Sequence, residues 1–319
     1  MSRTLDRRTF VKHTAITVAA LCASSVIPAV GAEQGATPVP NDAISARPAL
    51  KAPAHACDTH IHIMDARFPG IAPGAVAAAG MDMGSYRQLQ KQLGTERVVI
   101  VQPKLYGTRN DCILDAIAQF GAAARGIAVV DTAVTDAELE RLNAGGIRGI
   151  RFSVWNAKDA VVSIDMLAPL AERIKDLGWH VQLHMSGDQI VQHTTLLNSL
   201  QVPMVFDHMG RLPVEQGIKH PAFAVMANLV QADKAWVKLA GAYLNTLTGS
   251  PYADAGNVAR ALVELAPERL VWGSDWPHTT EPHKPDSGEL FDLLGNWAPT
   301  PQLRERVLVD NPARLYGFK

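Results

Sequence analysis

The sequence predicts an α/β protein: a single (β/α)8 TIM barrel, slightly distorted and preceded by a cleavable signal segment. From residue 54 onward, short apolar runs alternate with stretches of helical periodicity, which is typical of parallel strands joined by helices. About eight such runs occur, the number that closes a barrel. The roughly 265 residues that contain them match the usual barrel length of about 250.

The alternative fold is an open, doubly wound sheet, which usually has a glycine-rich turn after its first strand. Here that position reads Met-Asp-Ala-Arg-Phe over residues 64–68 and contains no glycine. The barrel is therefore preferred, and no second domain is expected.

The composition is that of an ordinary globular protein. The 319 residues carry a formal net charge of −1, with 47% hydrophobic and 19% charged residues. No basic patch or stripe stands out, so we expect no nucleic-acid partner.

Residues 1–32 are predicted to be an export signal. Arg7 and Arg8 precede an apolar run over residues 15–30, which two small residues follow. This layout resembles a twin-arginine (Tat) signal peptide. We expect the Tat export machinery as a partner, cleavage of the segment, a periplasmic location and no stable membrane association afterwards. An uncleaved N-terminal anchor is the alternative.

Residues 33–53 contain four prolines and are predicted to form an extended linker to the barrel domain, residues 54–319. Beyond the signal segment the chain has two cysteines, Cys57 and Cys112. Export would permit a disulfide between them, but their positions near core strands favour two free thiols.

The elements are read in chain order, strands from the apolar runs and helices from the periodic stretches between them. The predicted strands are Ala56–Met64, Arg97–Gln102, Gly126–Val130, Ile147–Phe152, His180–Met185, Pro203–His208, Trp236–Ala240 and Leu270–Asp275. The predicted helices are Ser85–Leu93, Asn110–Phe120, Asp136–Asn143, Ile164–Leu177, Ile190–Leu200, Pro221–Gln231 and Asn257–Leu265, with Pro301–Val309 as a closing helix.

Polar side chains cluster where the predicted strands end. His60 and His62 lie on one face of the first strand, because side chains alternate along a strand. The later strand ends hold Gln102, Arg151, His184, His208 and Asp275. In a parallel barrel these ends face one mouth, where active sites lie. A single histidine there is more often structural, but four histidines and an aspartate together predict a reaction site.

Four motifs resemble the amidohydrolase superfamily. They are His60-Ile61-His62, Phe206-Asp207-His208-Met209-Gly210-Arg211, Trp272-Gly273-Ser274-Asp275-Trp276-Pro277-His278 and Asp310-Asn311-Pro312-Ala313-Arg314-Leu315-Tyr316. The resemblance covers about residues 53–318. The branch that it indicates includes 2-pyrone-4,6-dicarboxylate lactonase, 4-sulfomuconolactone hydrolase, sugar-acid lactonases and galactarolactone isomerase.

This resemblance implies a mononuclear divalent-metal site, because the superfamily binds its ion with the His-x-His pair, a strand-five histidine and the strand-eight aspartate. The ligands carried over are His60, His62, His184 and Asp275. Imidazole and carboxylate ligands with one open position suit zinc. Arg151 stands where binuclear relatives have a bridging residue, so a second ion is not expected.

Two catalytic residues are implied. Asp275 would activate water as a general base, and His208 would hydrogen-bond the lactone carbonyl or the attacking water. A metal-free mechanism is the alternative, because the pyrone-dicarboxylate lactonase resembled here works without metal. That enzyme has no histidine at the strand-five position, so His184 favours a metal in this chain.

The predicted substrate-binding residues are Gln102, Tyr106, Arg151, Arg211, Tyr243 and His278. Residues 102–110 resemble the branch's Gln-Pro-x-x-Tyr-Gly-Thr-x-Asn loop, and the structural alternative is that Asn110 caps a helix while Gly107 makes the turn. The two arginines suit a carboxylate, because a guanidinium matches it with two parallel hydrogen bonds. The alternative for Arg211 is to tie the loop after His208 to its neighbours.

Four further predictions concern strand seven, His278 and the last motif. Strand seven lacks the carboxylate-holding arginine of the pyrone lactonase, which indicates a smaller or less acidic substrate. Tyr243 and Asn245 would then contact substrate hydroxyl groups, and His278 would touch the substrate or orient Asp275. Asn311 is predicted to cap the final short helix.

The predicted function is a hydrolase that opens a small acidic lactone of the sugar-acid lactone, muconolactone or pyrone-carboxylate type. Within the superfamily the alternatives are a lactone isomerase of the galactarolactone type and a metal-dependent decarboxylase. From another class, a non-catalytic periplasmic binding protein is disfavoured, because it would not need an aspartate base beside a histidine cluster.

Overall fold

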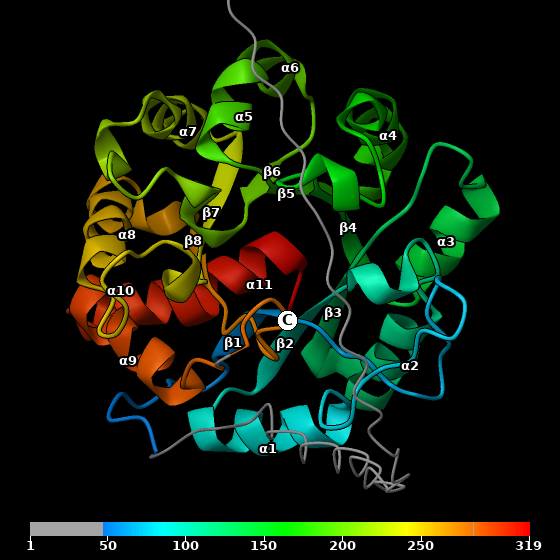
Figure 1. Cartoon of the computed structure of the whole chain (residues 1–319), viewed down its shortest axis with the longest axis horizontal. Coiled ribbons are helices and arrows are strands. Elements are labelled where there is room, and N and C mark those ends of the chain that lie inside the picture. Colours follow the sequence, from blue (N-terminus) through cyan, green and yellow to red (C-terminus); the bar gives the residue numbers. More distant parts are fainter. Residues whose placement is uncertain (1–46, 283) are drawn as a thin grey trace, which may run out of the picture. The chain divides into compact units, whose positions relative to one another are not determined.

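The computed structural model describes residues 47–282 and 284–319. Its eight strands are parallel and follow one another around one sheet in chain order (Figure 1). They are β1 Cys57–Ile61, β2 Arg97–Val101, β3 Ala124–Ala128, β4 Ile147–Ser153, β5 His180–His184, β6 Met204–Phe206, β7 Ala235–Leu239 and β8 Leu270–Trp272. The predicted barrel is confirmed. The expected signal peptide and most of the linker, residues 1–46, lie outside the described residues.

The barrel closes between β1 and β8 through few contacts. Ile61 forms a single parallel bridge with Trp276, and the Thr59 hydroxyl donates to the Trp272 carbonyl at 2.8 Å. The pairing of β1 with β2 shifts register between Asp58 and Ile61. The barrel is thus nearly closed and irregular at this seam.

Helices surround the strands as an outer ring, except for the last one, α11 (Asn311–Tyr316), which lies over the middle of the barrel in this view (Figure 1). They are α1 Met83–Leu93, α2 Asp111–Phe120, α3 Asp136–Ala144, α4 Leu167–Ile174, α5 Gly187–Gln192, α6 Thr194–Ser199, α7 Pro221–Gln231, α8 Ala253–Leu265, α9 Ser287–Trp297, α10 Pro301–Glu305 and α11 Asn311–Tyr316. Helix α1 illustrates how the local sequence sets both ends of a helix. Asp82 accepts a hydrogen bond from the Ser85 amide at its start, and Gly94 ends it in a left-handed conformation.

Several element predictions were wrong in detail. Helix α9 was missed, and the predicted helix 190–200 is two helices, α5 and α6, which are separated at His193. Strands β6 and β8 are two and three residues shorter than predicted at their C-terminal ends. His208 and Asp275 therefore lie in the turns after these strands.

The C-terminal segment packs against the side of the barrel that bears the strand starts. Tyr316 and Phe318 pack with Cys57 and Val99 in one buried cluster. Cys57 and Cys112 are both buried and free, as predicted. Within the described part of the chain, no helix has the length and hydropathy needed to span a membrane.

Candidate active site

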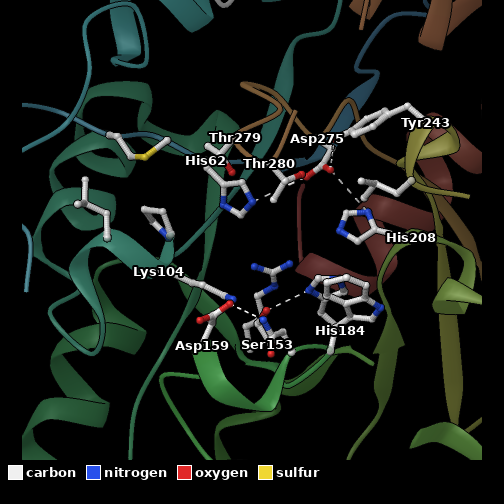
Figure 2. Close-up of a pocket in the computed structure, with 17 residues that line it drawn as sticks. His62, Lys104, Ser153, Asp159, His184, His208, Tyr243, Asp275, Thr279 and Thr280 are labelled. Carbon is white, nitrogen blue, oxygen red and sulfur yellow. Dashed lines mark hydrogen bonds and ion pairs between the residues drawn. The ribbon is translucent and has the colours of Figure 1, made fainter. Parts of the chain in front are cut away.

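A cavity of about 370 Å³ opens at the C-terminal ends of the strands (Figure 2). Its residues come from loops that follow the strands and from the ends of β4 and β5. They are His62, Met64, Pro103, Lys104, Leu105, Arg151, Ser153, Trp155, Asn156, Asp159, His184, His208, Tyr243, Leu244, Asp275, Thr279 and Thr280. The predicted catalytic pair, Asp275 and His208, therefore meets here with several of the predicted ligand and substrate-binding residues.

Asp275 lies at the centre of the polar part of this cavity. Its amide donates to the His60 carbonyl at 2.8 Å, which anchors the turn after β8 to β1. Its carboxylate Oδ2 accepts a hydrogen bond from the Tyr243 hydroxyl at 2.6 Å. Burial raises the pKa of Asp275 to about 7, although the Tyr243 hydrogen bond opposes the shift.

The buried carboxylate of Asp207 lies beside Nδ1 of His60. This Nδ1 lies 3.4 Å from Asp207 Oδ1, an oxygen that has no other hydrogen-bond partner among the described residues. Lys238 Nζ also lies 3.4 Å from this Nδ1, so His60 either donates to Asp207 through Nδ1–H or accepts from Lys238. In the first tautomer the lone pair of Nε2 points at Asp275 Oδ1, 3.5 Å away.

The tautomer of His62 follows from one contact. Its Nδ1 lies 2.9 Å from the Val101 carbonyl, which can only accept a hydrogen bond. Burial lowers the pKa of His62 to about 3, so the ring is neutral and its Nε2 carries a lone pair. That lone pair lies 3.8 Å from Asp275 Oδ1.

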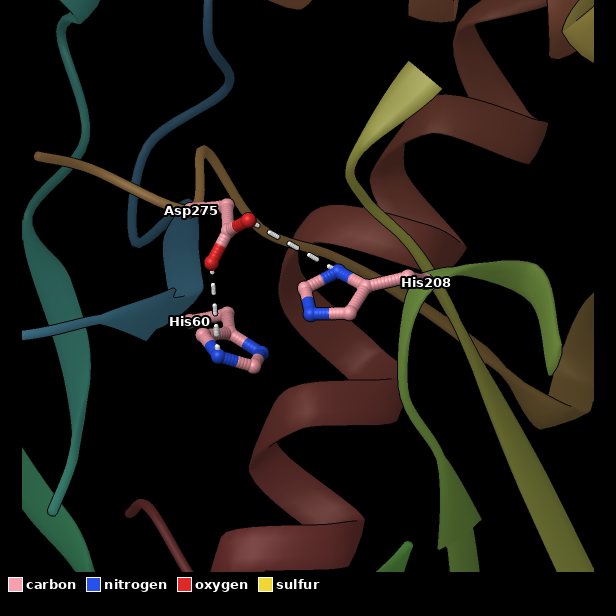
Figure 3. Close-up of side chains that lie close together, drawn as sticks. All are labelled: His60, His208 and Asp275. Carbon is pink, nitrogen blue, oxygen red and sulfur yellow. Dashed lines mark ion pairs between the residues drawn. The ribbon is translucent and has the colours of Figure 1, made fainter. Parts of the chain in front are cut away.

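Ligand atoms of three side chains thus converge. The Nε2 atoms of His60 and His62 both face Oδ1 of Asp275, at 3.5 and 3.8 Å. His208 completes the group: ligand atoms of His60, His208 and Asp275 lie within 4.8 Å of one another (Figure 3). Buried His60 Nε2 and His208 Nδ1 have no hydrogen-bond partner among the described residues.

His184 lies across the cavity from Asp275 (Figure 2). Its Nδ1 contacts the Ser153 hydroxyl at 3.0 Å, and its ring stands edge-on to His208 at 5.1 Å. Trp155 stacks nearly parallel to the His184 ring, at an interplanar angle of 7°. The structure therefore does not bring His184, a predicted ligand, into the compact group around Asp275.

These donors fit a divalent ion. Burial lowers the pKa values of His60, His184 and His208 well below the usual range, so the imidazoles are neutral and able to coordinate. The backing of His60 by Asp207 is the arrangement that orients metal-binding histidines in proteins. The compact group is His60, His208 and Asp275, so it includes neither His62 nor His184 of the predicted set, although His62 Nε2 lies 3.8 Å from Asp275 Oδ1.

A buried charged network beneath the histidines was missed by the sequence analysis. Lys238, fully buried on β7, donates to the Thr59 carbonyl and to Gln182 Oε1, each at 2.8 Å. Asp207 Oδ2 accepts from Arg151 Nε at 3.0 Å and from Gln182 Nε2 at 3.2 Å. A lysine within an apolar strand is the signal that could have revealed this network.

The ion pairs of this network keep Asp207 charged. Burial alone would raise the pKa of Asp207, but its partners His60, Arg151 and Lys238 hold it well below its usual range. Burial in turn lowers the pKa of Lys238 to about 8.

Arg151 and Lys104 give one wall of the cavity positive charge. Arg151 donates to Asp207 through Nε and lines the cavity. Lys104 lies at the mouth with Asp159 (Figure 2).

Four predicted substrate-binding residues do not line the cavity. Two of them hold loops in place. Gln102 Nε2 donates to the Gly107 and Arg109 carbonyls, and the Tyr106 hydroxyl bonds the Asp65 backbone.

Arg211 and His278 also lie outside the lining. Arg211 donates to the Leu244 carbonyl and packs 4.5 Å over the Trp155 ring, so it ties its loop to neighbours. His278 contacts Tyr243, not Asp275, through its side chain.

Two predicted helix caps were wrong. The Asn110 side chain makes no capping bond to α2; it exchanges hydrogen bonds with the Val129 backbone and so joins two loops. The Asn311 amide likewise donates to the carbonyls of Pro267 and Leu270, at 2.8 and 2.7 Å, rather than capping α11. In both cases a tertiary contact replaces the local one.

Comparison with known proteins gives a family match over almost the whole described chain. A family model described as amidohydrolase matches residues 57–318. The 4-sulfomuconolactone hydrolase of Rhizobium radiobacter is 35% identical over 274 residues, which cover 83% of this chain and 91% of that protein. The 2-pyrone-4,6-dicarboxylate hydrolase of Comamonas testosteroni is 33% identical over 282 residues, covering 85% and 92% of the two chains.

A third relative has a different named reaction. The D-galactarolactone isomerase of Agrobacterium fabrum is 30% identical over 269 residues and covers 83% of this chain and 91% of its own. Among solved structures, a probable 2-pyrone-4,6-dicarboxylic acid hydrolase from Acinetobacter baumannii, with citric acid bound, has a TM-score of 0.71 and 28% identity. That match covers 83% of this chain and 100% of the other.

Proposed function

The chain belongs to the amidohydrolase family, and on that premise we propose that it is a lactonase, which hydrolyses the ring ester of a small acidic lactone. The names of the relatives support this class, because a sulfomuconolactone and a pyrone dicarboxylate are both rings with acidic substituents. The observation that carries the proposal is the convergence of Asp275 with neutral histidines in the cavity at the strand ends.

Asp275 is the proposed general base. Its pKa of about 7 is close to the value at which a base is both ionised and basic enough at neutral pH. It would take a proton from the attacking water and later return it to the ring oxygen that leaves. Its place beside His208 allows both transfers within one cavity (Figure 3).

A divalent metal, zinc by ligand type, is the proposed cofactor. His60, His62, His208 and Asp275 would hold it, and a bound zinc ion lowers the pKa of its water from about 15.7 to about 7. His184 is proposed to contact the substrate instead, because this residue lines the cavity and its buried Nε2 has no partner among the described residues.

The acidic substituent of the substrate is proposed to bind Arg151 and Lys104. Arg151 is buried and fixed by Asp207, so it presents a preorganised fork to a carboxylate. The citric acid bound to the Acinetobacter baumannii protein supports an acidic ligand for this branch. The sulfur- and carboxylate-bearing lactones named for the relatives are the first compounds to assay.

The test is hydrolysis of a panel of acidic lactones by purified protein in ¹⁸O-labelled water. Hydrolysis must place solvent oxygen in the new carboxylate. Ring migration without label would instead indicate an isomerase, the reaction named for the Agrobacterium fabrum relative. No turnover of any lactone in the metal-loaded protein would contradict the proposal.

The cofactor is tested by metal analysis, chelation and readdition. Activity should fall on chelation and return with zinc. Full activity in verified metal-free protein would contradict the proposed metal cofactor. It would favour a mechanism in which histidines and Arg151 polarise the lactone carbonyl.

Export is a separate proposal, which rests on the twin-arginine pattern at residues 7–8. Cell fractionation of the double variant Arg7→Lys, Arg8→Lys tests it, because lysine keeps the charge but removes the arginine pair. The unmodified chain should reach the periplasm and the double variant should not. Equal periplasmic amounts of the two would contradict export by this route.

A further inference from the structure

A line of hydrogen bonds leads from Asp275 to the start of helix α9. The Tyr243 hydroxyl bonds Asp275 Oδ2 at 2.6 Å, and His278 Nδ1 lies 3.2 Å from the same hydroxyl. His278 Nε2 then lies 3.0 Å from the Ser287 hydroxyl. His278 and Ser287 are buried, whereas Tyr243 is partly exposed at the cavity wall.

The chemistry of the groups fixes the direction of each bond when Asp275 is ionised. A carboxylate only accepts, so the single hydroxyl proton of Tyr243 points at Asp275. The Tyr243 oxygen can then only accept, so His278 must carry its proton on Nδ1. In a neutral ring with its proton on Nδ1, Nε2 is an acceptor, and it lies 3.0 Å from the Ser287 hydroxyl, which donates to it.

The backbone around the line is fixed by other contacts. The His278 amide donates to the Asp275 carbonyl at 3.0 Å, and Lys284 Nζ donates to the His278 carbonyl at 2.6 Å. Tyr243 and His278 pack edge to face, with ring centroids 5.2 Å apart. The line therefore cannot shift without moving the turn that carries Asp275.

We propose that Tyr243, His278 and Ser287 form a directed hydrogen-bond chain that fixes the orientation of the Asp275 carboxylate in the cavity. Because Tyr243 occupies Oδ2, the oxygen left facing His60 and His62 is Oδ1. This inference rests on the proposed function. It makes Tyr243 and His278 positioning residues. Tyr243 was expected to contact substrate, and for His278 the inference selects the second of its two expected roles, orienting Asp275.

The first test needs no substrate. In ¹⁵N-histidine-labelled protein, with His278 assigned by its loss in the His278→Asn variant, NMR should show the Nδ1–H tautomer of His278. In Tyr243→Phe the acceptor is gone, and His278 should change to the Nε2–H tautomer that donates to Ser287. An Nε2–H tautomer in the unmodified protein would overturn the chain, as would an unchanged tautomer in Tyr243→Phe.

The second test separates positioning from substrate contact by kinetics. Tyr243→Phe should lower kcat by ~10- to 100-fold, the usual effect of losing a group that orients a catalytic residue, with KM changed by less than about twofold. A rise in KM with unchanged kcat would overturn the inference and restore a substrate-binding role. The matched control is Tyr252→Phe, which removes the same atom from another buried tyrosine that does not line the cavity.

Two variants of His278 test whether its Nδ1–H is the group that matters for kcat. His278→Asn places an amide N–H near the position of Nδ1 and should retain most of kcat, whereas His278→Phe should lower kcat as much as Tyr243→Phe. Equal losses in the two His278 variants would contradict the chain. Absence of any lactonase activity would defeat the proposed function while leaving the NMR result to decide the chain.

Discussion

Asp275 and His208 share an uncommon backbone conformation. Their φ angles are 64° and 50°, in the left-handed region that residues with a side chain rarely adopt. Such conformations cost of order 1–3 kcal/mol and concentrate at functional sites. Here the turn out of the strand direction brings both side chains to the cavity, where the proposed chemistry occurs.

The base assignment predicts the effect of Asp275→Asn. An amide cannot take a proton from water, so kcat should fall by about 10²- to 10⁴-fold, the usual contribution of general acid–base catalysis, while the melting temperature changes little. Steady-state kinetics with thermal unfolding measures both. Asp82→Asn, at the exposed start of α1, is the control and should be active; near-normal turnover in Asp275→Asn would refute the base.

The raised pKa of Asp275 predicts a measurable titration. Burial favours the neutral carboxyl, so in chelated protein Asp275 should be protonated below about pH 7 and ionised above it. A bound cation favours the ionised form, so zinc should move the midpoint to lower pH. The measurement is ¹³C NMR of aspartate-labelled protein, with Asp275→Asn for assignment. A midpoint that zinc leaves in place would argue against Asp275 as a ligand.

Two glycines offer a matched pair of substitutions in the loop after β7. Gly241 and Gly249 have nearly equal φ angles, 66° and 68°, but a Cβ on Gly241 would lie 2.8 Å from His208 Nδ1, while one on Gly249 would meet nothing within 4 Å. Both alanine variants should lose ~1–2 kcal/mol of unfolding free energy from backbone strain. Only Gly241→Ala should also lower kcat, and equal kinetics in the two variants would show that His208 tolerates the displacement.

At the scale of elements, the helix ends depend on contacts between distant segments. The Asn311 side chain, at the start of α11, donates hydrogen bonds to the backbone carbonyls of Pro267, before β8, and Leu270, the first residue of β8. Sequence pattern indicated a cap there, because asparagine is common at helix starts. The actual partners lie 44 and 41 residues away in sequence, so local pattern could not reveal them.

Removal of that side chain should destabilise the barrel. Asn311→Ala leaves two carbonyls without their donor, at a cost of about 1–3 kcal/mol each if water does not replace it. Asn198→Ala is the control, because its amide donates to one exposed carbonyl within α6. Urea unfolding measures the difference, and equal midpoints for the two variants would contradict the structural role.

Helix α9 shows why one element escaped prediction. Its sequence, Ser287–Trp297, is apolar on most sides, and seven of its eleven residues are buried. Leu290, Phe291, Leu294 and Trp297 nevertheless recur at helical spacing, and this is the signal that could have revealed the helix. Its position matters for the site, because Ser287 at its start ends the hydrogen-bond chain from Asp275.

At the scale of the whole molecule, the described barrel contains every residue of the proposed site. The Asp292 carboxylate holds the N-terminal end of the described chain in place, because it accepts hydrogen bonds from the Ala49 and Leu50 amides at 3.0 and 2.8 Å. A chain that starts at residue 47 should therefore keep the melting temperature and kcat/KM of the full chain. A large loss in either quantity would show that residues 1–46 contribute to the fold or the site.

The sequence by itself determined the barrel, the family and the strand ends at which the chemistry lies. It did so because alternating apolar runs and polar strand-end residues are local patterns, which can be recognised in the sequence without knowledge of the fold. The tertiary structure decided which histidines gather around Asp275, the tautomer that the Val101 carbonyl imposes on His62, and the buried Lys238 network. These features depend on contacts between strands far apart in the chain, and on burial, which sets the charge of each group.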